Sequence, residues 1–161
     1  MKTLLEEAPL ALFESPAAVS PNDYSERTVQ SGSVSLAVKT WGNPAHPTVV
    51  LVHGYPDNSE VWHEMAPLLA RDYYVVAYDV RGAGRSSSPS GMRNYTFARL
   101  TDDFIAVIDA LSPGKPVHLI AHDWGSIQSW EFVTEERLRG RIASYTSCSG
   151  CLLYTSDAAD E

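Results

Sequence analysis

The sequence predicts an α/β fold, in which an antiparallel β-hairpin precedes a parallel β-sheet covered by helices. Two observations lead to this prediction. Short apolar runs rich in β-branched residues alternate with segments of helical periodicity, and the joints between them are short and polar. Strands of this composition are buried on both faces, and their alternation with helices is typical of a doubly wound sheet. At 161 residues the chain has room for one domain.

The first elements are a leader, a hairpin and a strand. Residues 1–24 show no sustained periodicity, and we expect a leader there. Residues 27–42 contain two alternating segments around Ser31 and Gly32, which is typical of a β-hairpin. The run PTVVLVHG, residues 47–54, then predicts the first strand that is buried on both faces.

The next segment, residues 59–70, predicts a helix that covers this strand. Ser59 is the expected N-cap, because serine side chains accept hydrogen bonds from the free N–H groups of a first helical turn. The helical spacing of the apolar residues gives one buried face, made of Val61, Met65, Leu68 and Leu69.

The remaining elements repeat this alternation. A buried strand at 73–79 ends in a glycine-rich loop, and residues 96–111 form an amphipathic helix, because their apolar positions recur at three and four residues. A third buried strand at 115–122, a helix at 126–138 and a fourth strand at 141–149 follow. No closing helix comes after the fourth strand, which we interpret as a truncated domain.

Composition excludes several classes of partner. The formal net charge is -8, and no basic run exceeds two residues. Nucleic acids and anionic membranes are bound by clustered Lys and Arg, so neither is an expected partner. Acidic residues and a proline interrupt the apolar character near the N-terminus, so no signal peptide or membrane segment is predicted. We expect a cytoplasmic protein without cofactor or metal.

Two cysteines near the C-terminus do not change this expectation. Cys148 and Cys151 have the spacing C-x-x-C, but a single pair lacks the other ligands of a zinc site. Residues 151–161, CLLYTSDAADE, resemble a translated adapter from sequencing libraries. We expect a non-native tail there, and the alternative is a genuine polar tail of low order.

The pentapeptide AHDWG, residues 121–125, is the first candidate site. Ligands bind beyond the carboxyl ends of strands in open parallel sheets, and this segment follows one such strand. Small residues flank a central Asp123, as in the nucleophile elbow G-x-S-x-G with Asp in place of Ser. At a helix N-terminus the carboxylate is favoured in its charged form, which suits a nucleophile. From the pentapeptide alone, Asp123 is equally well interpreted as a helix N-cap.

A second motif, HGYP, follows the first buried strand. His53, Gly54, Tyr55 and Pro56 predict a tight turn that brings a backbone N–H toward the elbow. We expect His53 to hold this loop by hydrogen bonds. In a fold of this order, the amides of Tyr55 and Trp124 would form an oxyanion hole, while Gly125 allows the close approach of backbone atoms.

The glycine-rich segment DVRGAGRS, residues 79–86, does not predict dinucleotide binding. The third glycine and the helix start of a G-x-G-x-x-G motif are absent, and no acidic partner for a ribose lies at the expected offset.

In this order and at these separations, HGYPDNSEVW, YDVRGAGRSS and AHDWGS resemble the α/β-hydrolase family and, within it, the epoxide hydrolases. The similarity runs through residues 26–150. It implies the N-terminal part of an α/β-hydrolase domain over residues 25–150, with the lid and C-terminal strands missing. The sequences of these motifs also resemble those of bacterial proteins in which such a domain precedes a short-chain dehydrogenase domain.

The resemblance implies a role for each motif. Asp123 would open a small-molecule epoxide to give a covalent alkyl ester, and the amides of Tyr55 and Trp124 would stabilise the oxyanion when water hydrolyses that ester to a diol. The family also uses a histidine base, an acidic partner and lid tyrosines, which follow the strand ending near Ser149. They are absent from this chain, so we expect it to form the ester at most, without turnover.

Three alternatives stay open. A haloalkane dehalogenase shares the Asp nucleophile, and the Trp124 indole could hold its halide, but such enzymes commonly have Asn where this chain has Tyr55. A serine esterase would need Ser126, which lies too deep in the predicted helix. The third is a non-catalytic binding protein of the same fold. We interpret His122 as a packing residue, because neighbours on an elbow point in different directions.

Overall fold

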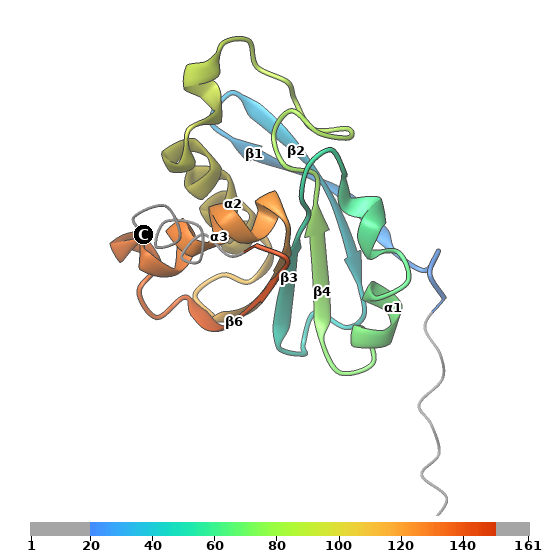
Figure 1. Ribbon diagram of the computed structural model, residues 1–161. Coiled ribbons are helices and arrows are strands. Elements are labelled where there is room, and N and C mark those ends of the chain that lie inside the picture. The colour runs from blue at the N-terminus through green and yellow to red at the C-terminus, as the bar shows by residue number, and fades with distance from the viewer. Residues whose placement is uncertain (1–19, 151–161) are drawn as a thin grey trace, which may run out of the picture.

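One mixed sheet of six strands organises the chain (Figure 1). The computed structural model describes residues 20–150. Most of the predicted leader, the predicted tail and Cys151 lie outside the described residues. The strands stand in the order β1-β2-β4-β3-β5-β6. Their bounds are β1 Ser25–Ser31, β2 Val34–Trp41, β3 Thr48–Val52, β4 Tyr74–Tyr78, β5 Val117–His122 and β6 Ile142–Cys148.

The predicted hairpin and parallel sheet are both confirmed. β1 pairs antiparallel with β2, and β2 with β4, whereas the pairs β3–β4, β3–β5 and β5–β6 are parallel. β3 and β4 are buried along their whole length, as expected for runs of β-branched residues between two layers. β6 stands at the edge of the sheet with most of its residues exposed, as expected for a last parallel strand without a helix to cover it.

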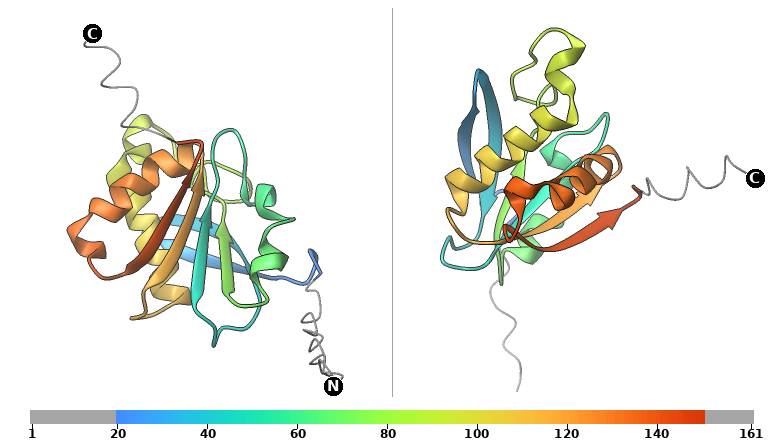
Figure 2. Two further views of the ribbon diagram at one scale, coloured as in Figure 1. Left: turned by 60° about the horizontal axis from the view of Figure 1, so that its bottom comes forward. Right: turned by 90° about the vertical axis from the view of Figure 1, so that its left-hand side faces the viewer.

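Helices cover both faces of the sheet (Figure 2). α2 (Phe97–Leu111) and α3 (Trp124–Thr134) lie on one face, where Phe104 and Phe132 pack with alternate residues of the strands. α1 (Ala66–Leu69) covers the other face together with Trp62. The crossover from β3 to β4 therefore lies on one face of the sheet and the crossover from β4 to β5 on the other. Because β4 and β5 stand on opposite sides of β3, a crevice is expected at the carboxyl end of β3.

The helix predicted over residues 59–70 is wrong in its extent, and of its predicted buried face only Met65 and Leu69 pack against the core. A 3₁₀ turn, Ser59–Trp62, is capped by the side chain of Asn58 instead of Ser59. α1 is a separate single turn with Pro67 near its start, because proline lacks the N–H that a continuous helix needs. This break changes the helical phase: Val61 and Leu68 are exposed, and Trp62, Ala66 and Ala70 are buried.

The other predicted helices keep their identity with shifted bounds. α2 matches the prediction closely, whereas α3 begins at Trp124 and ends at Thr134, before a 3₁₀ turn at Glu136–Leu138. Within residues 20–150, none of the helices has the length and apolar character that spanning a bilayer requires.

Candidate active site

Asp123 lies on a sharp turn between β5 and α3. Its backbone has φ 54° and ψ −128°, a conformation that non-glycine residues rarely adopt and that is found at functional sites held by their surroundings. Hydrogen bonds hold this turn from behind, since the Asp123 N–H donates to the carbonyl of Cys148 at 2.9 Å. The turn directs the Asp123 side chain away from the sheet, toward the loop after β3.

Two glycines make this turn possible. A Cβ atom on Gly125 would lie 2.4 Å from the carbonyl oxygen of Val52, and one on Gly54 would lie 2.5 Å from both Cβ and Oδ1 of Asp123. Such distances are shorter than any real contact allows. The loop after β3 and the elbow after β5 therefore touch only because both carry glycine at the point of contact.

The Asp123 carboxylate faces backbone amides. The Tyr55 N–H donates to its Oδ1 at 3.0 Å. The side chain makes no capping hydrogen bond to α3, although the residue stands at the N-cap position. The backbone amide of Trp124, followed by that of Tyr55, lowers the pKa of Asp123 below its ordinary value, against a smaller opposing effect of burial. The carboxylate is thus charged at neutral pH and supplied with donors.

His53 holds the HGYP loop from inside. Its ring is buried, and Nε2 accepts the Val80 N–H at 2.9 Å while Nδ1 lies 2.8 Å from the Gly54 carbonyl oxygen. Because Nε2 is an acceptor, the proton resides on Nδ1 and the ring is neutral. The loop continues through a cis peptide bond between Tyr55 and Pro56. Both ring nitrogens are engaged, so His53 has no free nitrogen for a ligand.

A large apolar hollow opens beside this site; Gly54, Tyr55 and Trp124 line it, whereas Asp123 itself is not among its lining residues. Its volume is about 1050 Å³, and its wall includes the HGYP loop, the glycine-rich loop and the first turns of α2 and α3. Several aromatic side chains in this wall are well exposed: Tyr55 at 77%, Trp124 at 56% and Phe97 at 43%. Exposed aromatic groups around a charged carboxylate are typical of a site for an apolar small molecule.

Comparisons with known proteins agree with this geometry. The family model described as alpha/beta hydrolase fold matches residues 47–161. The chain belongs to the α/β-hydrolase fold family. Among its relatives, the probable oxidoreductase EphD of Mycobacterium tuberculosis is 53% identical over 117 residues, or 73% of this chain and 20% of that protein. Epoxide hydrolase A of the same organism is 37% identical over 107 residues, or 66% of this chain and 33% of that protein.

Solved structures of epoxide hydrolases have the same fold as this α/β hydrolase. An epoxide hydrolase from Vigna radiata superposes with a TM-score of 0.75 at 32% identity, covering 83% of this chain and 42% of that one. Epoxide hydrolase A from Mycobacterium thermoresistibile gives 0.74 at 32% identity, with 84% and 44% covered. The chain thus spans less than half the length of these proteins.

Other predicted candidates of this α/β hydrolase lie outside the hollow. The hydroxyl of Ser126 is fully buried and donates to the Ala121 carbonyl at 2.7 Å, so it braces the elbow instead of facing a ligand. His122 is half-buried and does not line the hollow. Cys148 is a free, exposed cysteine, and the described residues contain no cluster that could hold a metal ion.

Asp79 is a structural residue of the site that sequence reasoning missed. Its carboxylate accepts the backbone N–H groups of Ser59 and Arg85, both at 2.8 Å, and so ties the turn after β3 to the glycine-rich loop. Burial raises the pKa of Asp79, but these hydrogen bonds outweigh it and the pKa lies below its ordinary value. A Cβ on Gly84 would lie 2.1 Å from Oδ2, which explains one of the loop glycines.

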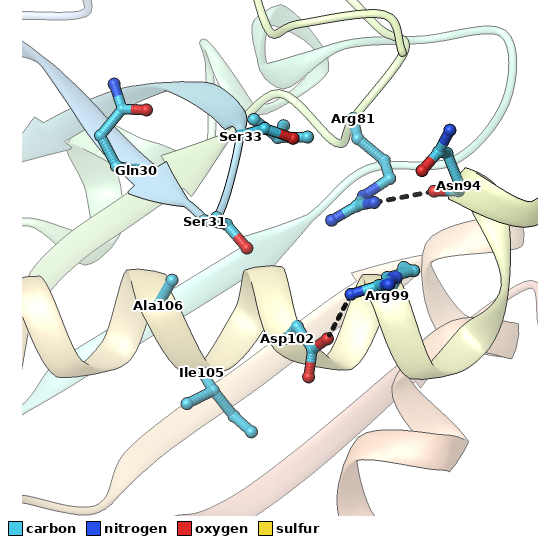
Figure 3. A pocket seen from close by; sticks show the side chains of 11 residues that line it. Gln30, Ser31, Ser33, Arg81, Asn94, Arg99, Asp102, Ile105 and Ala106 are labelled. Atoms are coloured by element: carbon cyan, nitrogen blue, oxygen red, sulfur yellow. Dashed lines mark hydrogen bonds and ion pairs between the residues drawn. The ribbon is translucent and has the colours of Figure 1, made fainter. Parts of the chain in front are cut away.

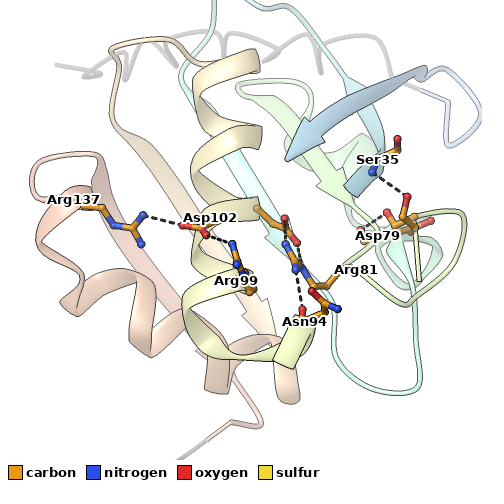
Figure 4. A network of polar contacts seen from close by, with 10 residues as sticks. Ser35, Asp79, Arg81, Asn94, Arg99, Asp102 and Arg137 are labelled. Carbon is orange, nitrogen blue, oxygen red and sulfur yellow. Dashed lines mark hydrogen bonds and ion pairs between the residues drawn. The ribbon is translucent and has the colours of Figure 1, made fainter. Parts of the chain in front are cut away.

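Arg81 anchors the same loop to α2. Its guanidinium donates to both oxygens of Asp103, at 2.5 and 2.6 Å, and to the Asn94 carbonyl at 2.7 Å (Figure 4). Arg81 also reaches a second hollow, of about 390 Å³, between the hairpin turn and α2 (Figure 3). The charged groups in that hollow already have partners, Arg99 in Asp102 and Arg81 in Asp103, and we assign it no ligand.

Acidification should weaken the fold through His53. Burial lowers the pKa of His53, and the hydrogen bond to the Gly54 carbonyl offsets only part of this shift. The unfolded chain gains this proton near the ordinary value of about 6.5. The stability from His53 is therefore complete above that pH and falls as the pH drops toward the lower folded-state pKa. Urea unfolding measures the free energy of unfolding at pH 8 and at pH 5. The decrease between the two should be smaller for His53→Gln, whose side chain cannot titrate, than for wild type and for the control His118→Gln.

Proposed function

We propose that this protein hydrolyses epoxides through a covalent ester on Asp123. The observation that carries the proposal is the position of the Asp123 carboxylate, which is charged, bound to the Tyr55 amide and adjacent to an apolar hollow. The epoxide hydrolases among the relatives support the same chemistry. A carboxylate suits attack at a saturated carbon, because the resulting ester can be cleaved afterwards.

In the first step, one carboxylate oxygen forms a bond to an epoxide carbon and the C–O bond of the ring breaks. The electron pair stays on the epoxide oxygen, which takes a proton from solvent water and becomes a hydroxyl. Because the Tyr55 N–H holds Oδ1, Oδ2 is the oxygen free to attack. The positive end of the α3 dipole and the amides keep the carboxylate charged until the substrate arrives.

In the second step, water attacks the carbonyl carbon of the ester. The negative charge develops on the oxygen that accepts the Tyr55 N–H, and the Trp124 amide is the second donor of this proposed oxyanion hole. Collapse of the intermediate breaks the bond between acyl carbon and alkyl oxygen and releases the diol. This step needs a base, and of the five histidines only His53 lines the hollow, with both nitrogens engaged. We therefore expect the ester to accumulate on the 161-residue chain.

Mass spectrometry tests this proposal. The chain is incubated with styrene oxide, and a mass increase of one epoxide per chain should map to the peptide that contains Asp123. Absence of an adduct, or an adduct on another carboxylate, would contradict the proposal. Haloalkanes matched to the epoxide test the alternative dehalogenase function. If the protein were a dehalogenase, the haloalkane would alkylate Asp123 and release halide, and the epoxide would leave Asp123 unmodified.

We further propose that the native protein combines this hydrolase domain with a dehydrogenase domain. Support comes from the name oxidoreductase that the EphD relatives carry and from the small share of those proteins that this chain matches. The gene sequence on the 3′ side of the codon for Gly150 tests this proposal, and a continuous reading frame without such a domain would refute it.

A further inference from the structure

Gln128 places a polar group with unused hydrogen-bonding capacity at the floor of the apolar hollow. It is on α3, one turn beyond Trp124, and its side chain is only 5% exposed although it lines the hollow. Oε1 of Gln128 is itself buried and, among the described residues, has no hydrogen-bond partner, so a ligand in the hollow would reach it after the carboxamide rotates about its last side-chain bond. Buried carboxamides are almost always paired, so an unpaired one needs an explanation.

The packing below Gln128 gives no such explanation. One turn further along α3, Phe132 stacks on Phe104 of α2 with ring centroids 4.6 Å apart. Leu100, one turn before Phe104, lines the hollow as Gln128 does. An apolar side chain of the same length would continue this contact without leaving a polar group unpaired. The carboxamide therefore contributes nothing to the fold that methionine or leucine could not supply.

The geometry points instead to a ligand. The helix rise places the Cα atom of Gln128 about 7.5 Å beyond that of Asp123 along the axis of α3. Side chains on a helix lean toward its N-terminus, so the carboxamide of Gln128 leans toward the site of attack. Trp124 and Gln128 are four residues apart on one face of α3 and both line the hollow, so a molecule attacked by Asp123 that extends over Trp124 would bring its next few atoms to Gln128.

We propose that Gln128 determines specificity by hydrogen bonding to a hydroxyl group that the epoxide carries a few carbon atoms from the ring. A hydroxyl group donates to the carboxamide oxygen and accepts from its NH₂ group, so it fits either orientation of the amide. The preferred substrates are then epoxy alcohols, with an otherwise apolar chain that fits the aromatic wall. This inference rests on the proposed covalent chemistry of Asp123.

The test compares epoxy alcohols of graded chain length with deoxy counterparts in which a methyl group replaces the hydroxyl. The rate of ester formation on Asp123 is followed by mass spectrometry on the 161-residue chain. At the best chain length the wild type should react about tenfold or more faster with the alcohol, because an unpaired polar group penalises the deoxy compound. Gln128→Met should bring this ratio close to one. Its rate with the deoxy epoxide should equal or exceed the wild-type rate with the same compound.

Gln30→Met is the matched control, since Gln30 is exposed on β1 and bonds to Ser35 outside this hollow. It should keep the wild-type ratio. An unfolding midpoint for Gln128→Met at or above that of wild type shows that the fold is intact. Equal rates with both epoxides in the wild type, or a ratio that survives Gln128→Met, would overturn the inference alone. If no epoxide modifies Asp123, the proposed function itself is wrong and the role of Gln128 falls with it.

Discussion

Replacing Asp123 with asparagine is expected to slow covalent reaction with epoxides at least about a thousandfold while the chain stays folded. The carboxamide is uncharged and a far weaker nucleophile, yet its oxygen can still accept the Tyr55 N–H that Oδ1 accepts in the wild type. The loss therefore measures nucleophilic capacity and not loop position. The rate of adduct formation with styrene oxide, together with a urea unfolding curve, provides both measurements.

The pH profile sharpens this experiment. Because the amides of Trp124 and Tyr55 lower the pKa of Asp123, the wild-type rate should stay level from pH 8 to below the ordinary carboxyl value of about 4, as far as the fold survives. Asp72→Asn is the control, since Asp72 is an exposed carboxylate outside the hollow, and its rate should match the wild type. A rate for Asp123→Asn within tenfold of wild type would rule out Asp123 as the nucleophile.

Replacing Arg81 with methionine is expected to cost about 3–5 kcal/mol of unfolding free energy, the largest stability effect that we predict. The Arg81 and Asp103 side chains are 4% and 1% exposed, and the substitution leaves the Asp103 carboxylate buried without its partner. The glycine-rich loop would also lose its link to Asn94. Urea unfolding monitored by tryptophan fluorescence measures the change.

The double variant Arg81→Met/Asp103→Leu separates an unpaired charge from general damage to the core. It should recover most of the lost stability, because apolar residues of similar volume replace buried ion pairs at little cost. Arg139→Met is the exposed control: Arg139 and Glu136 are 80% and 75% exposed, and their pair should leave the unfolding midpoint unchanged. A double variant as unstable as Arg81→Met would show that the pair is not the cause.

The local sequence pattern was sufficient to predict an element where that element has the same surroundings along its whole length. β3 and β4 are buried on both faces, and the large apolar residues of α2 other than Phe97 pack against one layer, so composition and period predicted them well. The segment around Pro67 failed this condition, because a proline interrupted the helix and shifted its phase. The strand at 141–149 is exposed because none of the described elements covers that edge of the sheet.

The sequence by itself determined the order of strands and helices, the elbow at Asp123 and the need for small residues around it, since these follow from neighbours in the chain. The order of the motifs also predicted that the Tyr55 amide faces the elbow, and the structure shows its hydrogen bond to Asp123 across 68 residues. Only the tertiary structure revealed the pairing of Arg81 with Asp103, which are 22 residues apart, because no local period encodes such a contact. Nor does it encode the hollow above Gln128. Local periodicity determines which way a side chain points along its own element, whereas its partner depends on how the elements pack around β3.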